Sequence, residues 1–410
     1  MNKQIQKNIP REWTKQRLGS IGVFTKGAGI SKDQLSEVGH NVVRYGELYT
    51  KFDVKIERIY SYIPSEIIPS TREIKYGDIL FAGSGETNDE IGKSAVYFLK
   101  ESCYAGGDII IFSPKSANSL FLSYFLNTGE ARKRLRELGQ GQSVVHIHKN
   151  DLENLEFNFP LLEEQNRIVR VLETWDSAIE KLGRKIEIKK RIKKGLMREL
   201  LAGKTRLSGF NGEWEANKLS DVCEIKKGLG LSKVKLNDKG KYECILYGEL
   251  YTTYSEIINE IKSKTNEKEG NLSMAGDILI PSSTTTCALD LAIAACLNRK
   301  KVLLGGDISI LRAKKIYNSI FLALYLSHIK KHNLARLAQG ITIVHLYGKD
   351  FKKIEISIPK IEEQNAIADI LVTADREIAE LERKLGILKN QKKYLLNNLI
   401  TGAIRVPEGI

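Results

Sequence analysis

The chain has 410 residues, with 64 Lys and Arg against 50 Asp and Glu, which gives a formal net charge of +14. Its apolar content of 42% and charged content of 28% are typical of a globular protein and exclude a disordered one. No apolar run reaches the roughly 18–20 residues of a membrane helix, and no apolar signal segment opens the chain, so we expect a cytoplasmic protein. The positive charge favours an anionic partner, most often nucleic acid, with a role in solubility as the alternative.

The first 160 residues predict a β-rich domain. Short runs of Val, Ile, Phe and Tyr alternate with Gly, Asn, Asp and Pro, as in SIGVFTK, NVVRYGEL, GDILFAG, SAVYFL and DIIIFS. Such runs are typical of strands joined by turns. One helix interrupts them over residues 116–139, and we expect it in two pieces.

After Pro160 the pattern becomes that of one long helix. Residues 163–202 contain no proline, and their apolar residues recur at alternating steps of 4 and 3, which is a heptad pattern. Glu163 and Glu164 fill the first turn, where acidic side chains complement the helix dipole, and Gly203 stands where the helix should end. At about 1.5 Å per residue, the predicted helix is about 60 Å long.

The remaining residues repeat this whole arrangement at an offset of 199 to 202 positions. The stretch PLLEEQNRIV returns as PKIEEQNAIA, RYGELYT as LYGELYT, GDILF as GDILI, and QGQSVVHIHKNDL as QGITIVHLYGKDF. A period of this length is too long for a solenoid, so it predicts two copies of one unit of about 200 residues.

Neither long helix can bury its apolar stripe alone, and the simplest partner for each is its duplicate. A pseudo-two-fold axis would pair them antiparallel and place two globular domains at opposite ends of a stiff rod. The predicted fold class is therefore α+β, with two homologous β-rich domains, each followed by a helix of an antiparallel coiled coil. The predicted boundaries are 1–160, 161–206, 207–359 and 360–410, the last including a C-terminal tail.

The predicted seam between the helices consists of heptad-spaced apolar side chains. It contains Ile168, Leu172, Trp175, Ile179, Leu182, Ile186, Leu196, Leu200, Ile367, Leu371, Ile378, Leu381, Leu385, Leu388, Leu395 and Leu399. Lys193 and Lys392 interrupt the seam at matching places, and Lys189 stands where the second copy has Leu388.

Catalytic signatures do not persist between the copies. The chain has no Pro-Pro pair and therefore lacks the Asn/Asp-Pro-Pro-aromatic loop of DNA amino-methyltransferases. His146 and His148 resemble a pair of metal ligands, but the second copy keeps only His345, which favours a shared structural role. Five cysteines without a C-x-x-C pair predict reduced thiols rather than disulfides or zinc. We therefore expect no catalytic residue and no metal in this chain.

The chain resembles the specificity subunits of type I restriction-modification systems over its whole length. The resemblance is carried by REWTKQRLGSIG and GEWEANKLSDV, by the GDIL strands, and above all by the Pro-x-x-Glu-x-Gln-x-x-Ile pattern that opens both long helices. It implies two target-recognition domains, each reading half of a bipartite DNA site, and paired helices that space them and dock two methyltransferase (modification) subunits. It further implies restriction subunits with ATP-driven translocation, and S-adenosylmethionine, ATP and Mg²⁺ used on the other subunits. The alternative is a non-catalytic coiled-coil scaffold that binds protein or RNA without reading DNA sequence.

Two segments are candidates for contact with DNA bases. The first is the repeated YGELYT segment, where Glu and Arg are suited to cytosine and guanine and a structural strand end is the alternative; its candidates are Arg44, Tyr45, Glu47, Tyr49, Tyr247, Glu249 and Tyr251. The second is the polar loop after GDIL, which diverges between the copies while its flanks persist; its candidates are Glu86, Thr87, Asn88, Ser283, Thr284 and Thr285. Candidate phosphate contacts, with ordinary solvated lysines as the alternative, are Lys26, Lys32, Lys227 and Lys233.

Overall fold

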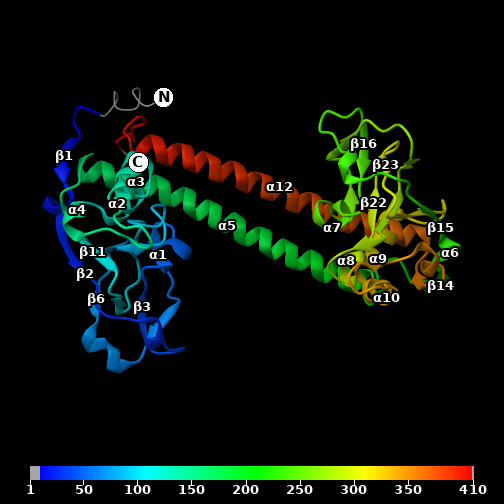
Figure 1. The fold of residues 1–410 in the computed structure, drawn as a ribbon, viewed down its shortest axis with the longest axis horizontal. Coiled ribbons are helices and arrows are strands. Elements are labelled where there is room, and N and C mark those ends of the chain that lie inside the picture. The colour runs from blue at the N-terminus through cyan, green and yellow to red at the C-terminus, as the bar shows by residue number, and fades with distance from the viewer. Residues whose placement is uncertain (1–9, 409–410) are drawn as a thin grey trace. The chain divides into compact units, whose positions relative to one another are not determined.

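The structure is a computed structural model that describes residues 10–408, and the chain divides into two compact units (Figure 1). Unit 1 consists of the residues up to Leu182 together with the segment from Lys384 onward, and unit 2 is Gly183–Arg383. Among the helices of the described residues, none combines the length and the apolar character that crossing a membrane requires.

The globular part of unit 1 contains two main sheets. The five-stranded sheet has the order β2-β11-β7-β9-β4, with the bounds Gly22–Lys26, Ile109–Pro114, Ile79–Ala82, Ser94–Tyr97 and Lys55–Ile56. The four-stranded sheet has the order β5-β3-β10-β6, with the bounds Ser61–Ile63, His40–Val43, Cys103–Ala105 and Arg72–Ile74. Within these sheets β3–β10 and β4–β9 are parallel and the other pairs are antiparallel.

The five-stranded sheet of unit 1 is buried on both faces. Phe81 and Phe112 point to a cluster that includes helix α2 (Ser119–Leu126), whereas Leu80 and Ile111 point to a cluster shared with the four-stranded sheet. Successive side chains of a strand alternate between faces, so a strand buried on both sides must be apolar at every position. This explains the continuous apolar runs of GDILF and DIIIF.

Unit 2 repeats both sheets in the same spatial order. Its five-stranded sheet has the order β15-β24-β20-β22-β17, with the bounds Cys223–Lys227, Ile308–Ala313, Asp277–Pro281, Ala295–Leu297 and Ile257–Ile258. Its four-stranded sheet has the order β18-β16-β23-β19, with the bounds Ser263–Thr265, Tyr242–Ile245, Leu303–Leu304 and Asn271–Leu272. The duplication inferred from sequence is therefore a duplication of topology.

A two-stranded antiparallel sheet in each unit joins the entry of the domain to its exit. In unit 1 it pairs β1 (Thr14–Arg17) with β13 (Glu156–Phe159). In unit 2 it pairs β14 (Glu215–Lys218) with β26 (Glu355–Ile358). These pairs fix the chain immediately before each long helix begins.

The helix predicted over residues 116–139 is in two pieces, as expected. Helix α2 ends at Leu126 and α3 (Gly129–Glu137) follows, with Gly129 at a φ of +56° between them. Unit 2 has α9 (Ser319–His328) and α10 (Lys331–Arg336) in the same places. Asn118 and Asn318 cap the first piece in each unit, accepting the backbone N–H of Phe121 and Phe321 at 2.9 Å.

The two predicted long helices are confirmed as α5 (Leu162–Leu200) and α12 (Ile361–Leu399), and they pack together. In unit 1, Leu172 and Leu399 belong to one buried cluster, and in unit 2, Leu200 and Leu371 belong to another. Every residue of the predicted seam is buried or half-buried, whereas Ile188 and Ile387, which match each other in the two copies, are exposed.

The repeated Gln-Asn of EEQN fastens the start of each long helix to its own domain. The Gln165 carboxamide accepts the Asn118 N–H at 2.9 Å and donates to the Pro160 carbonyl at 2.9 Å, and the Asn118 amide donates to Asn166 at 2.8 Å. The second copy makes the same set through Gln364, Asn365 and Asn318. These bonds hold the two-piece helix of the domain against the first turn of the long helix.

The second glutamate of each EEQN is a buried carboxylate that binds an arginine. In unit 1, Arg405 holds Glu164 through two bonds, Nε to Oε1 at 2.5 Å and Nη2 to Oε2 at 2.8 Å. In unit 2, Arg206 holds Glu363 through the same two bonds at 2.7 and 2.6 Å. Each arginine follows the end of one long helix and each glutamate opens the other, so in both units the pairing is antiparallel.

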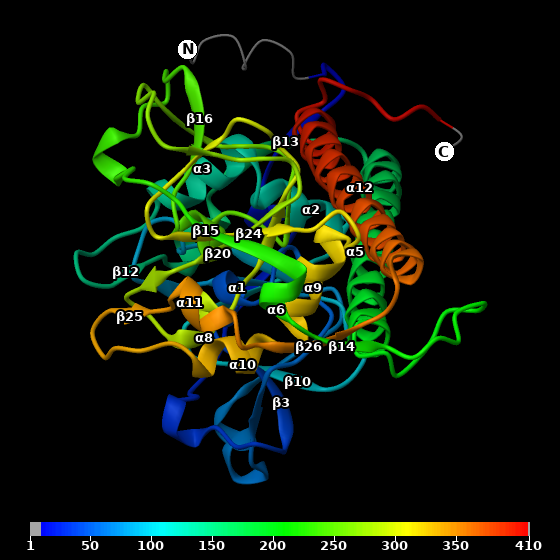
Figure 2. The same cartoon turned by 90° about the vertical axis from the view of Figure 1, so that its right-hand side faces the viewer.

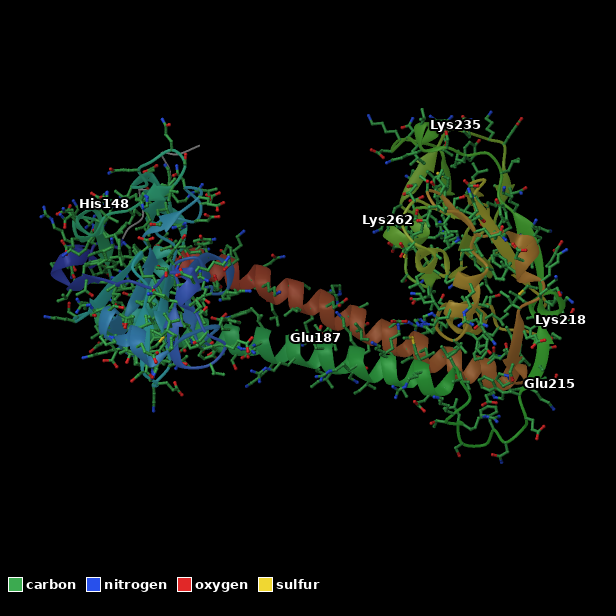
Figure 3. The ribbon with its side chains drawn as sticks, turned by 60° about the horizontal axis from the view of Figure 1, so that its bottom comes forward. His148, Glu187, Glu215, Lys218, Lys235 and Lys262 are labelled. Carbon is green, nitrogen blue, oxygen red and sulfur yellow. The ribbon has the colours of Figure 1, made fainter. Side chains whose placement is uncertain are left out.

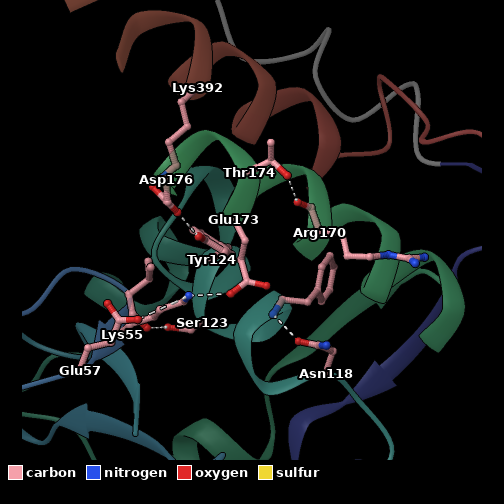
Figure 4. Close-up of polar contacts among 12 residues, drawn as sticks. Lys55, Glu57, Asn118, Ser123, Tyr124, Arg170, Glu173, Thr174, Asp176 and Lys392 are labelled. Carbon is pink, nitrogen blue, oxygen red and sulfur yellow. Dashed lines mark hydrogen bonds and ion pairs between the residues drawn. The ribbon is translucent and has the colours of Figure 1, made fainter. Parts of the chain in front are cut away.

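Polar side chains also tie the domain of unit 1 to both long helices (Figure 4). The buried Tyr124 hydroxyl donates to Asp176 of α5, and the same carboxylate binds Lys392 of α12. The Lys392 ammonium lies 5.3 Å from the centre of the Tyr124 ring, and Lys55 of β4 binds Glu173 at 2.7 Å. The lysine that interrupts the predicted seam is therefore neutralised across the helix pair.

Candidate nucleic-acid interface

The glutamates of the repeated YGELYT segment point into the protein. The Glu47 carboxylate, 8% exposed, accepts the backbone N–H of Arg44 at 2.9 Å and the Ser61 hydroxyl at 2.7 Å. The Glu249 carboxylate accepts the Leu246 N–H at 2.7 Å and the Ser263 hydroxyl at 2.6 Å. These bonds close the turn before the short helices α1 (Glu47–Thr50) and α7 (Glu249–Thr252), so the structure gives both carboxylates a structural partner.

The segment is not a continuous strand, which corrects the prediction for NVVRYGEL. Strand β3 ends at Val43, and the chain turns into α1 at Glu47. The cause is the inward Glu47 carboxylate, because a side chain that accepts a backbone N–H three residues earlier stabilises a turn. A distant hydroxyl completes this arrangement, and local alternation of residues cannot reveal it.

The remaining candidates in this segment are half-buried and lie beside the divergent loop. The Tyr45 and Tyr49 ring centres are 6.4 Å apart. Burial raises the pKa of Tyr49, the charges of Glu90, Tyr45 and Glu86 raise it further, and Arg44 lowers it. The two segments that the sequence singled out in the first copy are therefore neighbours in unit 1. In unit 2, Tyr247 and Tyr251 are likewise half-buried.

The divergent loop of unit 1 presents three exposed candidates. Glu86, Thr87 and Asn88 follow the short strand β8 (Ser84–Gly85), and the Glu90 carboxylate accepts the N–H of Glu86 at 2.8 Å. The loop is thus held by its backbone while its first side chains face solvent. This is the arrangement that contact with a ligand requires.

The matching loop of unit 2 buries two of its candidates. Ser283 and Thr284 form β21, and of the three candidates in this loop Thr285 is the exposed one. The Ser283 hydroxyl is 3.0 Å from Nδ1 of His345, and the Thr284 hydroxyl is 2.8 Å from that of Thr286. Unit 1 has the same serine–histidine pair, with the Ser84 hydroxyl 2.8 Å from Nδ1 of His146. This pair is the shared role of the two matching histidines, whereas His148 lies exposed on unit 1 (Figure 3).

The four candidate lysines are exposed at the ends of short elements. Lys26 and Lys227 end β2 and β15, and Lys32 and Lys233 begin the 3-10 turns Lys32–Gln34 and Lys233–Lys235. Lys227 also lines a cleft of about 450 Å³ in unit 2. Further lysines stand out from the same unit, including the exposed Lys218, Lys235 and Lys262 (Figure 3).

The cleft contains residues that the sequence analysis did not select. Besides Lys227 and Ser283, its lining includes Lys226, Lys349, Lys352, Asp307, His345 and Tyr347. The His345 and Tyr347 rings stack at 5.8 Å, and the Lys349 ammonium lies 5.5 Å from the centre of the Tyr347 ring. The available signal was the repeated QGxxxVH stretch, because a stretch that persists between diverging copies has a common role.

The described residues show neither a metal-binding cluster nor a reactive buried thiol. They contain no group of three or more His, Cys, Asp and Glu side chains able to hold a metal ion. Burial raises the pKa of the Cys103, Cys223 and Cys296 thiols to about 12 and that of Cys244 to about 11, so none of these four forms a thiolate near neutrality. Cys287 is the exposed cysteine, and its Sγ lies 3.6 Å from the Asp290 carboxylate.

Two homologous β-rich domains on packed long helices, with exposed lysines and loops that differ between the copies, define a duplicated protein with two equivalent candidate binding surfaces. The chain belongs to the family of the type I restriction modification DNA specificity domain, whose family model matches residues 10–190 and 211–389. It is a DNA specificity subunit of a type I restriction-modification system, and this family is not catalytic. Membership also sets aside the coiled-coil scaffold without DNA readout.

Specificity subunits of known sequence and solved structures of this kind match the chain over nearly its whole length. The type I restriction enzyme MjaVIII specificity subunit of Methanocaldococcus jannaschii is 24% identical, over 97% of this chain and 94% of its own. The crystal structure of the type I restriction-modification S subunit from M. genitalium matches with a TM-score of 0.58 and 17% identity, covering 96% of each chain. A chain from work on complex assembly and conformational transition of the type I R-M system matches with a TM-score of 0.59 and 20% identity, covering 97% of this chain and all of that one.

Proposed function

We propose that each β-rich domain reads one half of a bipartite DNA site, and that α5 and α12 set the spacing and dock two methyltransferase subunits. Two duplicated domains carry the proposal, because their shared scaffold holds loops that differ in sequence and exposure. In this reading residues 1–160 and 207–359 are the target-recognition domains, and 161–206 and 360–410 are the spacer helices and tail. Residues 1–9 and 409–410 lie outside the described structure.

The arrangement of charge supports binding to the DNA backbone. Exposed Lys26, Lys32, Lys227 and Lys233 are suited to phosphate contacts, which supply affinity without sequence information. The exposed Glu86, Thr87, Asn88 and Thr285 are suited to base edges. Arg44, Tyr45 and Tyr49 are half-buried near the unit 1 loop, Tyr247 and Tyr251 are half-buried in unit 2, and all five have part of their surface available. Glu47, Glu249, Ser283 and Thr284 contribute mainly by holding the loops in place.

The partners of the complex supply the chemistry. We infer that methyl transfer from S-adenosylmethionine occurs on the modification subunits, and that restriction subunits use ATP and Mg²⁺ in the full assembly. The DNA substrate implies that the protein works in the cytoplasm. Two recognition surfaces about one helical turn apart, roughly 34 Å, would meet equivalent grooves on one face of the duplex. The site should therefore be two short words with a fixed gap.

Reconstitution tests this proposal. The purified chain alone should transfer no methyl group from S-adenosylmethionine to DNA, and a cognate modification subunit should make methylation appear at one bipartite sequence. Methyl transfer by the chain after rigorous removal of partner subunits would contradict the proposal. Methylation by the reconstituted complex without any sequence preference would contradict it as well.

A further inference from the structure

Each unit contains a short hairpin that the shared QGxxxVH stretch builds. In unit 2 the hairpin is closed by two backbone bonds between Gln339 and His345, at 2.8 and 2.7 Å, and in unit 1 by two between Gln140 and His146, at 2.9 and 2.8 Å. Its second half includes β25 (Val344–His345) or β12 (Val145–His146), which pairs with β21 or β8. The hairpin therefore lies directly beside the strand from which the divergent loop emerges. Figure 2 labels β12 and β25.

A glycine fixes the bend of each hairpin. Gly340 has a φ of +116°, and a Cβ there would lie 2.1 Å from the Ile343 carbonyl oxygen. Gly141 has a φ of +126°, and its Cβ would lie 2.1 Å from the Val144 carbonyl oxygen. No other residue fits without moving the chain, so the tip is built in one conformation in both units.

The tip exposes apolar side chains beside a basic cleft. Ile341 is 100% exposed and Ile343 is 49% exposed, while Val144, which matches Ile343 in unit 1, is 47% exposed. The foot of the unit 2 hairpin is His345, whose ring lines the cleft together with Lys226 and Lys227. An aliphatic tip on a hairpin whose base adjoins a lysine-lined cleft is suited to DNA, because lysines bind phosphates while aliphatic carbons contact base edges.

The two tips share a pattern and differ at one chemical position. Unit 1 reads Gly-Gln-Ser-Val over residues 141–144, and unit 2 reads Gly-Ile-Thr-Ile over residues 340–343. The glycine, the hydroxyl and the β-branched residue persist, whereas Gln142 becomes Ile341. The two tips therefore share one backbone framework and differ in one exposed side chain. Two domains that read different bases at equivalent places need this combination.

We propose that the hairpin tips enter the major groove, and that Gln142 and Ile341 are specificity-determining residues. Gln142 has a carboxamide, which pairs with adenine through N6 and N7, and Ile341 has only aliphatic carbon, which packs on the thymine methyl group. This inference rests on the proposed function, because it assigns one base in each half-site of the same DNA. Because the thymine methyl group lies only in the major groove, a hairpin tip that contacts this methyl group must enter the major groove.

Removal of single methyl groups from DNA tests the role of Ile341. The bipartite site is first defined by methylation of a DNA library by the complex reconstituted with its modification subunit. Each thymine of the second word is then replaced by uracil, which lacks only the methyl group. With the wild-type chain, uracil at one position should lower the methylation rate about fourfold, the effect of losing one buried methyl contact. With Ile341→Ala the rate should already be lowered, and uracil at that position should lower it no further.

One further variant acts as a control and another as a reciprocal test. Ile316→Ala removes another exposed isoleucine of unit 2, which follows β24 and lies outside the hairpin, and it should retain the wild-type response to uracil. Ile341→Gln should shift the preferred base at that position toward adenine and leave the first word unchanged. Because Ile341 is fully exposed and Ile316 is 64% exposed, thermal unfolding of Ile341→Ala, Ile341→Gln and Ile316→Ala should match the wild type, so a lowered rate reports contact and not misfolding.

The outcomes separate this inference from the proposed function. If the complex methylates a bipartite site but Ile341→Ala keeps the wild-type rate and the wild-type uracil response at every position, the tip is not a reader and only this inference fails. If the complex shows no sequence preference at all, the proposed function fails and the inference fails with it. A uracil effect that disappears only in Ile341→Ala supports both.

Discussion

The Lys193 ammonium lies 2.5 Å from the Asp375 carboxylate, which joins α5 to α12 within unit 2. Lys392 and Asp176 form the matching pair in unit 1. Each lysine occupies a place in the heptad seam where an apolar residue would be expected, and each is only 15% exposed. The interruption of the apolar pattern is therefore a matched pair of cross-helix ion pairs.

Removing one partner of the Lys193–Asp375 pair should destabilise unit 2. Asp375→Asn leaves the mostly covered Lys193 ammonium without its counter-charge, and we expect a loss of about 1 kcal/mol in the free energy of unfolding, since the aspartate is partly solvated. Lys193→Met should cost less, because an apolar side chain of similar length fills the seam. A double-mutant cycle measured by denaturant unfolding gives the coupling, and a coupling of zero would contradict a contribution from the pair.

A fragment ending near Leu207 should form a symmetric dimer through α5. In such a dimer Lys193 would meet Asp176, because Asp176 matches Asp375 in the repeat, whereas Lys189 would meet Ala178 in place of its present partner Glu377. Lys189→Leu should therefore strengthen self-association by about tenfold, since it removes an unpaired charge and buries an aliphatic chain. Sedimentation that shows only monomers of both fragments at micromolar concentration would argue against this helix pairing.

The two arginine–glutamate pairs should be important for stability. Arg206→Ala leaves the buried Glu363 carboxylate without its bidentate partner, and we expect a loss of about 2–3 kcal/mol. Arg405→Ala should cost somewhat less, because the Trp13 indole still donates to Glu164 at 3.3 Å. Lysine at either position should recover only part of the loss, since it cannot bind both oxygens at once. Equal stability of Arg206→Ala and the wild type in urea would refute a stabilising role.

Glu47 and Glu86 should behave differently although both are candidate base contacts. Glu47→Ala removes the acceptor of the Arg44 N–H and the Ser61 hydroxyl, so we expect a loss of about 1–3 kcal/mol in stability. Glu86→Ala, at an exposed loop position, should leave stability unchanged and relax one base position of the first word by roughly tenfold, as one base contact implies. Thermal unfolding and methylation of a DNA library measure the two effects separately. A Glu47→Ala variant that is as stable as the wild type would contradict the structural role assigned to this carboxylate.

The long helices could be predicted from sequence because their signals are local. The heptad steps, the acidic first turn and the closing glycine placed the first helix at 163–202, and α5 is Leu162–Leu200. The duplication supplied an independent check, since a feature found twice at one offset is not accidental. The β-rich character of each domain and the broken helix followed from the same kind of local pattern, whereas the division of the strands into two sheets did not.

Other features depend on contacts that no local pattern shows. The sequence pattern indicates that Glu164 complements the helix dipole, yet its carboxylate binds Arg405, 241 residues away. The sequence pattern makes Glu47 a candidate for contact with cytosine, yet its carboxylate accepts a hydrogen bond from a hydroxyl on another strand. Ser283 lies in the divergent loop but bonds to His345, in a serine–histidine pair that both units share. The same polar atoms of a side chain can contact DNA bases or stabilise the domain, and the burial of the side chain distinguishes the two roles.

Exchange of the divergent loops tests whether each domain reads one half of the DNA site. The loop at residues 82–92 is moved into the second domain in place of residues 281–290, and the methylated sequence of the reconstituted complex is determined on a random DNA library. One domain per half-site predicts that the second word changes toward the first, while the first word and the gap stay the same. A change in both words, or an unchanged second word in a complex that still methylates its site, would contradict the account.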